Sequence, residues 1–384
     1  MSEPPSAATS AKSFTLGQIS DLIGAELVGD RDYRVQRPVA PGGRVRAGDI
    51  VIAFAPDPGS ILADSGAQSA LIAAGAVAPE GLAGYLVTRR PRLAMARLLN
   101  LFAAEPVSDG GIHQSAVVHP SAQLGEGVSL GPHVVVGPGA RIGRGSRLLA
   151  NVYVGGEAVI GDDCLLYPGV CILDRVRVGD RNIIHANAVL GADGFGFVTP
   201  EPSTLELAAA RDGRVKTQNG PVERIASLGT VETAEEVEIG ACTTIDRGTL
   251  SATRIGRRTK IDNQVQIGHN VRVGEDCLFA GKVGLAGSVV IGNRVMIGGA
   301  AGVADGVRVG DDALIAAAAG VIGNVPAGEI HAGVPALRKD HKAEEVVNLT
   351  RLPRVIRELL DLRRRLEFLE RAVGVAEREG KKHD

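Results

Sequence analysis

The stretch from residue 123 to residue 148 reads QLGEGVSLGPHVVVGPGARIGRGSRL, and its pattern repeats every six residues. An aliphatic residue recurs at this spacing, and in most repeats a glycine follows it. The aliphatic spacing runs unbroken from Ile112 to Leu190, and an apolar residue keeps it again from Ile255 to Val321. Neither an α-helix nor a simple alternating strand fits such a pattern well. The stretch therefore predicts a repeat architecture.

A short strand and a turn fit into each repeat, with one apolar side chain pointing inward from each face. Three such faces close one coil of three hexapeptides, which is the hexapeptide parallel β-helix. Residue i then lies over residue i+18, at the strand spacing of about 4.8 Å. The predicted fold class is mainly β, with a parallel β-helix over 112–335, a small N-terminal α/β domain and a C-terminal helix.

Two insertions interrupt the period, at residues 191–230 and 245–254. The second one adds four residues before the spacing resumes at Ile255. Loops that leave a rigid scaffold are frequent places for binding groups, so both insertions are candidate parts of a site. A neutral insertion is the alternative for each.

The flanking segments differ in kind from the repeat. We predict a disordered N-terminus over 1–13, an α/β domain over 14–102, a linker over 103–111, a helix over 343–376 and a tail over 377–384. The helix carries apolar residues at spacings of 3 and 4, which is typical of a coiled-coil seam: Leu352, Val355, Leu359, Leu362, Leu366, Leu369 and Val373. Because this seam has no evident partner in the chain, we expect it to pack on copies of itself or on the solenoid. It favours an oligomer, and a trimer suits a three-sided prism.

Composition excludes several classes of function. A net charge of −2 gives no reason to expect nucleic-acid binding. The N-terminus lacks the features of a secretory signal, and no stretch is long enough to span a membrane, so we expect a cytoplasmic protein. The four cysteines show no C-x-x-C spacing, so neither a zinc site nor a disulfide framework is predicted. Cys277 falls at an inward position and is expected in the core.

The stretch KIDNQVQIGHNV, residues 260–271, is unusually polar for a scaffold repeat. Imidazole suits proton removal near neutral pH, which makes His269 a candidate general base. Asp262 is a candidate to orient it. One coil later stands Gly287, whose backbone N–H could hold an oxyanion. These are the minimum groups for acyl transfer; the alternative is that His269 is structural or merely exposed.

Five motifs, in this order, resemble the UDP-3-O-(3-hydroxyacyl)glucosamine N-acyltransferases of lipid A biosynthesis, a family of the hexapeptide acyltransferase superfamily: GADGFGF (191–197), EIGACTTIDRGTL (238–250), KIDNQVQIGHNV (260–271), LAGS (285–288) and AGVPA (332–336). The resemblance covers nearly the whole chain. It implies a left-handed coil and a homotrimer with active sites between subunits. It also implies transfer of a 3-hydroxyacyl group from acyl carrier protein to the 2-amino group of UDP-3-O-acyl-glucosamine. The carrier's phosphopantetheine thioester is a substrate, and no cofactor is implied.

The same resemblance assigns expected roles to residues of this chain. His269 matches the general base, Gly287 the oxyanion donor, and Asp262 a residue that orients the base. The residues expected to touch substrates are Asn263, Gln266, Asp193, Phe195, and, against the uracil of a uridine-binding domain, Phe54 and Asp57. Asp57 replaces an amide and, when ionised, can accept but not donate a hydrogen bond.

Further expectations concern the two substrates. An acidic carrier should dock on basic residues, and the candidates are Arg254, Arg257, Arg258, Lys260 and the run Arg363 to Arg365. The small residues of IAAAAGVIG, 315–323, suggest a roomy acyl groove. The stretch GGAAGVADGVRVG, 298–310, lacks the histidine that the family often has there. Two alternatives stay open. The first is a different acyltransferase, either the related O-acyltransferase or one that acts on another nucleotide amino sugar. The second is a non-catalytic trimeric scaffold.

Overall fold

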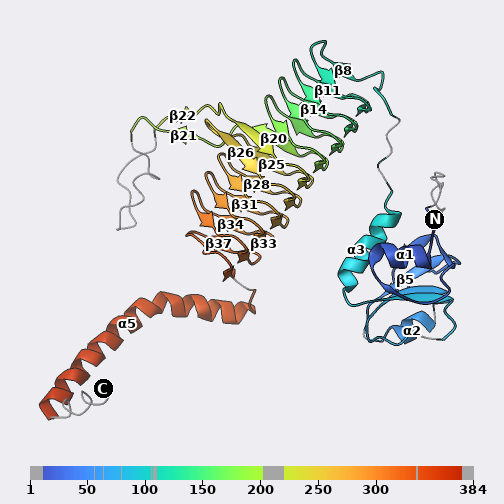
Figure 1. Cartoon of the computed structure of the whole chain (residues 1–384). Helices are drawn as coiled ribbons and strands as arrows, with labels where there is room; N and C mark the ends of the chain where they lie inside the picture. Colours follow the sequence, from blue (N-terminus) through green and yellow to red (C-terminus); the bar gives the residue numbers. More distant parts are fainter. Residues whose placement is uncertain are drawn as a thin grey trace, which may run out of the picture. The chain divides into compact units, whose positions relative to one another are not determined.

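The computed structural model describes residues 12–373, apart from 56, 64, 79, 105, 107–109, 202–219 and 334–335. The chain divides into two compact units, Met1–Val107 and Ser108–Asp384, and the division falls inside the predicted linker. Figure 1 shows both units, coloured along the sequence. The predicted disordered start, apart from Lys12 and Ser13, and the predicted tail over 377–384 lie outside the described residues, as do residues 374–376 of the predicted helix.

The first unit is a small α/β domain. Its sheet has the order β2-β7-β6-β5-β4, in which only β2 and β7 pair antiparallel. Its elements are β1 (Phe14–Thr15), α1 (Leu16–Ile23), β2 (Glu26–Gly29), β3 (Arg34–Val35), β4 (Arg37–Val39), β5 (Asp49–Ala53), α2 (Pro58–Ala63), β6 (Ser69–Ala73), β7 (Gly84–Thr88) and α3 (Pro91–Phe102). Helix α1 begins at a capping box formed by Thr15 and Gln18 and ends at Gly24 in the left-handed conformation.

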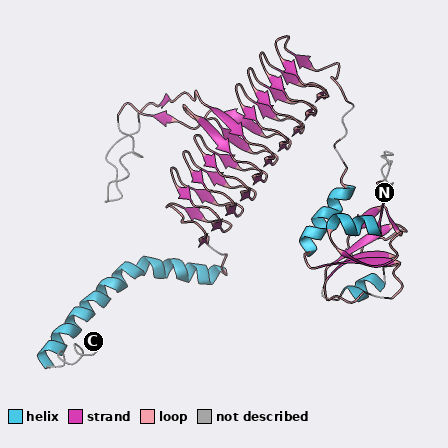
Figure 2. Ribbon diagram, viewed as in Figure 1, coloured by secondary structure: helices cyan, strands magenta, loops and turns pink. Residues whose placement is uncertain are grey.

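The second unit is a parallel β-solenoid with three sheets, as the period of six predicts (Figure 2). Sheet 1 contains β10 (Ser129–Leu130), β13 (Arg147–Leu148), β16 (Leu165–Leu166), β19 (Ile183–Ile184), β24 (Glu238–Ile239), β27 (Lys260–Ile261), β30 (Leu278–Phe279), β33 (Met296–Ile297), β36 (Leu314–Ile315) and β38 (Ile330–His331). Sheet 2 contains β8 (Val117–Val118), β11 (Val135–Val136), β14 (Tyr153–Val154), β17 (Cys171–Ile172), β20 (Val189–Ala192), β25 (Thr244–Asp246), β28 (Gln266–Ile267), β31 (Gly284–Leu285), β34 (Gly302–Val303) and β37 (Gly320–Val321). Sheet 3 contains β9 (Gln123–Leu124), β12 (Arg141–Ile142), β15 (Val159–Ile160), β18 (Arg177–Val178), β23 (Thr230–Thr233), β26 (Ala252–Ile255), β29 (Arg272–Val273), β32 (Val290–Ile291) and β35 (Arg308–Val309).

The strand register confirms the predicted coil length. Arg141 pairs with Val159, and Gln266 pairs with Gly284, so residue i pairs with residue i+18 in both sheets. The repeated apolar residues form one continuous core inside the solenoid, where Ile160 and Ile267 are fully buried. Cys277 belongs to this core, as predicted. The left-handed sense of the coil stays a prediction that the resemblance supplies.

Both insertions appear where the period breaks. Between β20 and β25, Val189 pairs with Thr244 rather than with a residue one coil later, because a long excursion intervenes. The excursion carries an antiparallel pair, β21 (Phe197–Val198) and β22 (Glu223–Arg224), which projects from the solenoid (Figure 1). Between β25 and β28 the register is 22 rather than 18, which is the predicted excess of four.

The C-terminal helix α5 (Lys339–Val373) begins four residues before the predicted start and continues through Pro353. Its predicted seam is exposed at every position whose burial is described: Leu352, Val355, Leu359, Leu362, Leu366 and Leu369. The seam therefore has no apolar partner among the described residues, and its pairing with other copies stays a prediction. None of the helices in the described part of the chain combines the length and apolar character that a membrane crossing needs.

Candidate active site

His269 lies in the turn that connects sheet 2 to sheet 3. The turn follows β28, whose inward residue Ile267 is fully buried and anchors it. Asn270, with φ of 60°, adopts the left-handed conformation that recurs at the turns of the coil. The half-buried imidazole is therefore held on a turn whose backbone the core fixes at one end.

Gly287 lies directly beside the imidazole, on the next coil. A Cβ atom at this position would lie 2.6 Å from Cε1 and 2.8 Å from Nε2 of His269, so only glycine leaves the ring its place. The Gly287 N–H finds no acceptor within the described part of the chain. A buried donor without a partner beside a histidine is suited to hold an oxyanion.

Asn270 contacts the other ring nitrogen. Its Nδ2 lies 3.0 Å from Nδ1 of His269, while its Oδ1 accepts the Thr249 N–H at 2.9 Å. The backbone N–H of Thr249 can only donate, so the atom of the Asn270 amide that faces it is the oxygen, and the amide nitrogen faces His269. In this arrangement Nδ1 accepts the hydrogen bond, and the neutral ring carries its proton on Nε2.

A hollow of about 540 Å³ opens in front of His269 and Gly287. Asp193, Phe195, Phe197 and Arg224 of the first insertion line one side of it. The guanidinium of Arg224 lies 5.0 Å from the centre of the Phe197 ring and 3.6 Å from the Asp193 carboxylate. The first insertion therefore brings aromatic and charged groups to the histidine.

Asp246 is the carboxylate that faces His269 from the preceding coil. Gln266 donates to it from Nε2 at 3.1 Å, and the Thr244 hydroxyl donates to Oε1 of the same amide, which fixes the amide's orientation. Burial raises the pKa of Asp246, while the hydrogen bond from Gln266 and, when the ring is protonated, the charge on His269 lower it in part. Asp246 is thus an acid whose charge is coupled to the imidazole.

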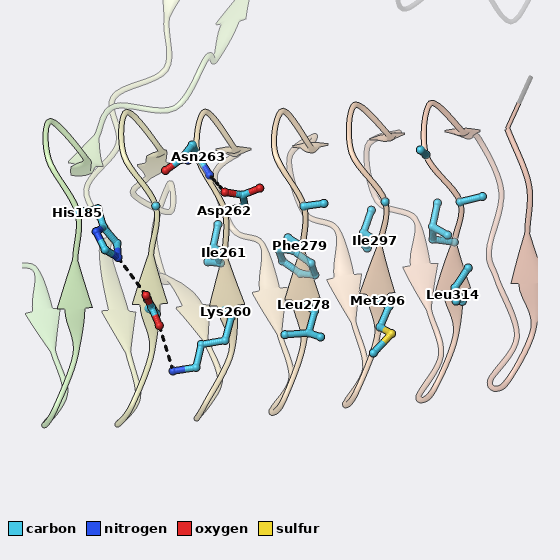
Figure 3. A pocket seen from close by; sticks show the side chains of 17 residues that line it. His185, Lys260, Ile261, Asp262, Asn263, Leu278, Phe279, Met296, Ile297 and Leu314 are labelled. Atoms are coloured by element: carbon cyan, nitrogen blue, oxygen red, sulfur yellow. Dashed lines mark hydrogen bonds and ion pairs between the residues drawn. The ribbon is translucent and has the colours of Figure 1, made fainter. Parts of the chain in front are cut away.

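A second hollow, of about 820 Å³, lies over sheet 1 (Figure 3). Leu278, Met296 and Leu314 point outward there on successive coils and form an apolar row. Ala316 and Ala317, from the stretch predicted to line an acyl groove, border the same hollow.

The polar end of the sheet 1 hollow holds a chain of charged groups. Glu238 lies 3.0 Å from Nε2 of His185 and 3.7 Å from Nζ of Lys260. Asp262 and Asn263 stand at the same end, where Asn263 Oδ1 accepts the Ala241 N–H at 2.6 Å. The sheet 1 hollow is therefore apolar along its length and charged at one end.

The structure brings together only some of the predicted site residues. Four of the other candidates in the solenoid or its insertions join His269 at one hollow: Gly287, Gln266, Asp193 and Phe195. Asp262 and Asn263 lie instead at the turn between sheet 1 and sheet 2. The hypothesis that Asp262 orients His269 is therefore not supported within one chain, because the two residues follow different faces of the coil.

Phe54 and Asp57 belong to the first unit. Phe54 follows β5 and packs partly against the core of that unit. Asp57 precedes α2, and its Oδ1 accepts the Gly59 N–H at 3.1 Å, as a helix cap does. Their predicted contact with a uracil ring stays a prediction.

The basic cluster predicted to dock a carrier is ion-paired. Arg258 contacts Asp276 at 2.6 Å, and Arg254 contacts Glu232 at 3.0 Å. Arg257 lies between Glu235 and Glu275, and Lys260 next to Glu238. These carboxylates neutralise much of the cluster's positive charge. On α5, Arg363 pairs with Glu367.

Sequence reasoning did not find Asp246, Asn270, Arg224 or Asp305, which all lie at or next to the His269 hollow. Asp305 could have been found by counting, because it stands one regular coil after Gly287. Asp246 could not be placed by the same rule, because the four-residue insertion changes the register to 22. No group of three His, Cys, Asp or Glu side chains able to hold a metal occurs among the described residues.

Comparison with known proteins places the chain among hexapeptide-repeat transferases. The family model for the bacterial transferase hexapeptide (six repeats) matches residues 121–156 and 157–192, and that for the hexapeptide repeat of succinyl-transferase matches 288–322. A UDP-3-O-acylglucosamine N-acyltransferase of Ruegeria pomeroyi is 44% identical over 92% of this chain and 97% of its own length.

Two further comparisons cover less of the chain. A UDP-3-O-acylglucosamine N-acyltransferase 1 of Francisella tularensis is 46% identical over 71% of this chain and 74% of its own length. The solved structure of an Arabidopsis UDP-N-acetylglucosamine acyltransferase is 27% identical, with a TM-score of 0.48 over 58% of this chain and 71% of that one.

Proposed function

Because the chain belongs to the UDP-3-O-acylglucosamine N-acyltransferase family, we propose that it transfers a 3-hydroxyacyl group from acyl carrier protein to the 2-amino group of UDP-3-O-acyl-glucosamine in lipid A biosynthesis. The observation that carries the proposal is the hollow where the imidazole of His269 meets the free N–H of Gly287. Proton removal and oxyanion binding are the two tasks that acyl transfer from a thioester requires.

In this mechanism the acceptor amine attacks the thioester carbonyl while His269 takes its proton. The Gly287 N–H holds the oxyanion of the tetrahedral intermediate. The C–N bond forms in this attack. The oxyanion then restores the carbonyl, the C–S bond breaks, and the proton passes from His269 to the leaving phosphopantetheine thiolate. Because the thioester is already activated, the reaction needs no cofactor or metal.

Proton removal by Nε2 requires a lone pair on that nitrogen and therefore a proton on Nδ1. Asn270 presents its amide nitrogen to Nδ1, which favours the opposite tautomer. On this proposal the Asn270 amide turns over when the acceptor binds. Its oxygen then accepts the Nδ1–H of His269 and gives up the bond from the Thr249 N–H. Asn270 then sets the tautomer of the base.

The hollow over sheet 1 is proposed to hold the acyl chain. Its row of Leu278, Met296 and Leu314 offers apolar surface on three successive coils, and the neighbouring alanines leave it wide. Burial of each methylene in such a groove contributes about 0.8 kcal/mol. The length of the chain that fits is set by side chains along this row.

A homotrimer is supported by the different outer faces of the sheets. In each strand of sheet 2, the outward residue just before the inward one carries no charge: Val117, Val135, Tyr153, Cys171, Val189, Thr244, Gln266, Gly284, Gly302 and Gly320. Asp246, at the end of β25, is the charged residue among the described strands of this sheet. Those of sheet 3 include five arginines: Arg141, Arg177, Arg254, Arg272 and Arg308. Depletion of charge is typical of an interface, so sheet 2 is the face proposed to meet another copy. In such an assembly the turn with Asp262 and Asn263 could approach the His269 of a neighbouring copy.

One assay tests the function and separates the alternatives. The purified protein is incubated with a 3-hydroxyacyl carrier protein and either UDP-3-O-acyl-glucosamine or UDP-N-acetylglucosamine, and the product mass is measured. The proposal expects acylation of the first acceptor only. Acylation of the second would indicate the O-acyltransferase, and no acylation of either would favour the scaffold.

A further inference from the structure

Three carboxylates line the His269 hollow, and they differ in their ion pairs and hydrogen bonds. Asp193 lies 3.6 Å from Arg224 and 3.9 Å from Arg247. Asp246 accepts from Gln266. Asp305 has neither an ion pair nor a hydrogen bond within the described part of the chain, so its charge is the one left for a ligand.

Asp305 occupies a position that has a repeated structural role in this solenoid. This position is the second residue after an inward residue. When it holds Asp or Asn, the side-chain oxygen regularly accepts a hydrogen bond from the backbone N–H at the same position one coil earlier. Six such bonds, of 2.6 to 2.9 Å, occur: Asp162 to Arg144, Asp174 to Gly156, Asp180 to Asp162, Asn263 to Ala241, Asn293 to Glu275 and Asp311 to Asn293.

By the same rule Asp305 should accept the Gly287 N–H, yet that bond is not made among the described residues. The Asp305 carboxylate instead borders the space over Gly287. A Cβ on Gly287 would lie 2.8 Å from Oδ1 of Asp305 and 2.8 Å from Nε2 of His269. Since both atoms lie 2.8 Å from this one point, Oδ1 of Asp305 and Nε2 of His269 are close enough to share a ligand atom. A nitrogen atom of a bound ligand could hydrogen-bond to both.

We propose that Asp305 is the specificity-determining residue that receives the acceptor's amine in its ammonium form. The inference rests on the proposed function and names how the site selects its acceptor. An ammonium group can donate to Asp305 and, with its remaining hydrogens, point towards His269. Once it has lost one proton to solvent, the neutral amine can attack, and His269 takes the second proton. A hydroxyl acceptor carries no charge and gains little from this carboxylate.

This role also fits a Gly287 N–H that no described residue caps. A carboxylate that capped this amide, as the other six positions do, would occupy the place of the oxyanion. When an ammonium holds Asp305, the carboxylate has a partner of opposite charge and does not need the amide N–H to satisfy it. The acceptor therefore keeps the oxyanion donor open for the thioester carbonyl.

The test compares Asp305→Asn with Asp305→Ala in the full chain. Asparagine can cap a backbone N–H, as Asn263 and Asn293 do, but it cannot attract an ammonium. We expect both variants to raise the KM for the amine acceptor by about ten- to a hundred-fold, the usual range for a charge-assisted hydrogen bond. The KM for the acyl donor should not change. Asp162→Asn, at the same position of a hexapeptide repeat away from the hollow, is the matched control and should keep the wild-type KM.

Two outcomes would overturn the proposal. If Asp305→Asn behaves as wild type while Asp305→Ala unfolds or loses activity, the residue is a structural cap. If both variants raise kcat with an unchanged KM for the acceptor, Asp305 merely obstructs the oxyanion donor.

A direct binding measurement separates this proposal from the proposed function. The dissociation constant of the amine acceptor is measured by calorimetry on the wild type and on Asp305→Asn, without an acyl donor. If the wild type fails to transfer acyl groups but loses affinity for the amine when Asp305 is changed, the function is wrong and the amine site stands. Equal affinity of the two proteins would overturn the amine site alone.

Discussion

Two stretches of the solenoid, 141–184 and 261–306, share one backbone and differ in how their turn groups are paired. In the first, the Arg144 N–H is capped by Asp162, whose own N–H is capped by Asp180. In the second, the Gly287 N–H and the Asp305 carboxylate are left without each other beside His269. The difference teaches that the repeat fixes where each turn residue lies. Groups become available for chemistry where the hydrogen bond between neighbouring turns is not made, as between Asp305 and Gly287.

Removal of the base should produce the largest effect. His269→Ala is expected to reduce turnover by about 10²- to 10⁴-fold, the usual contribution of general acid–base catalysis. Its melting temperature should remain near that of the wild type, because the half-buried ring belongs to no core cluster. Turnover is measured by product mass and unfolding by circular dichroism. Full activity in this variant would show that the catalytic base does not lie in the stretch 261–306.

The next effect should come from adding one methyl group between the two coils. Gly287→Ala puts a Cβ 2.6 Å from Cε1 of His269, so the ring must move away from the oxyanion donor. We expect turnover to fall by about 10²- to 10³-fold, as when one oxyanion donor is lost. Gly156→Ala, at the same turn position two coils before the insertions, is the matched control: a Cβ there meets no atom closer than 3.5 Å, and the variant should keep its activity. Equal losses in both variants would contradict the account.

Inward residues test whether scaffold and chemistry can be separated. Ile160→Ala and Ile267→Ala each remove a fully buried side chain, one from each stretch. Both should destabilise the fold by about 2–5 kcal/mol, measured by urea unfolding. Only Ile267→Ala should also lower turnover of the folded protein, because Ile267 anchors the turn that carries His269. A similar loss of activity in both variants would mean that the stretches do not differ in function.

The smallest effect is expected at the residue that sets the tautomer. Asn270→Asp can accept the Nδ1–H of His269 with one oxygen and the Thr249 N–H with the other. We expect its turnover to stay within about ten-fold of wild type, while Asn270→Leu, which cannot accept, loses more. The comparison is made by steady-state kinetics at one pH. A greater loss in the aspartate variant would show that His269 works as an Nε2–H donor.

Much of the fold could be predicted from the sequence because a solenoid is governed by local repetition. The period of six places Ile267 inside, and the register of i to i+18 places Gly287 beside His269. The site was predicted less completely. Asp246 reaches His269 only through the four-residue shift, and Arg224 only through the fold of the first insertion.

The separation of Asp262 from His269 within one chain has a similar physical origin. Its spacing from His269 along the chain crosses from one face of the prism to the next, so the two side chains leave different corners. The spacing of seven residues suggests that Asp262 and His269 are close, but it does not show that their side chains point away from each other at two corners of the coil. Contacts with other copies of the chain, on which the roles of Asp262 and the seam of α5 depend, are outside what one chain can specify.

The most direct test of the central claim is chemical rescue. In His269→Ala the hollow gains room for a free imidazole beside the Gly287 N–H, so added imidazole should restore part of the lost turnover. In Gly287→Ala the base is displaced rather than absent, and imidazole should restore nothing. Amide product is measured for both variants across a series of imidazole concentrations. A rise confined to His269→Ala is the predicted result, and an equal response of the two variants, or none in either, would contradict the account.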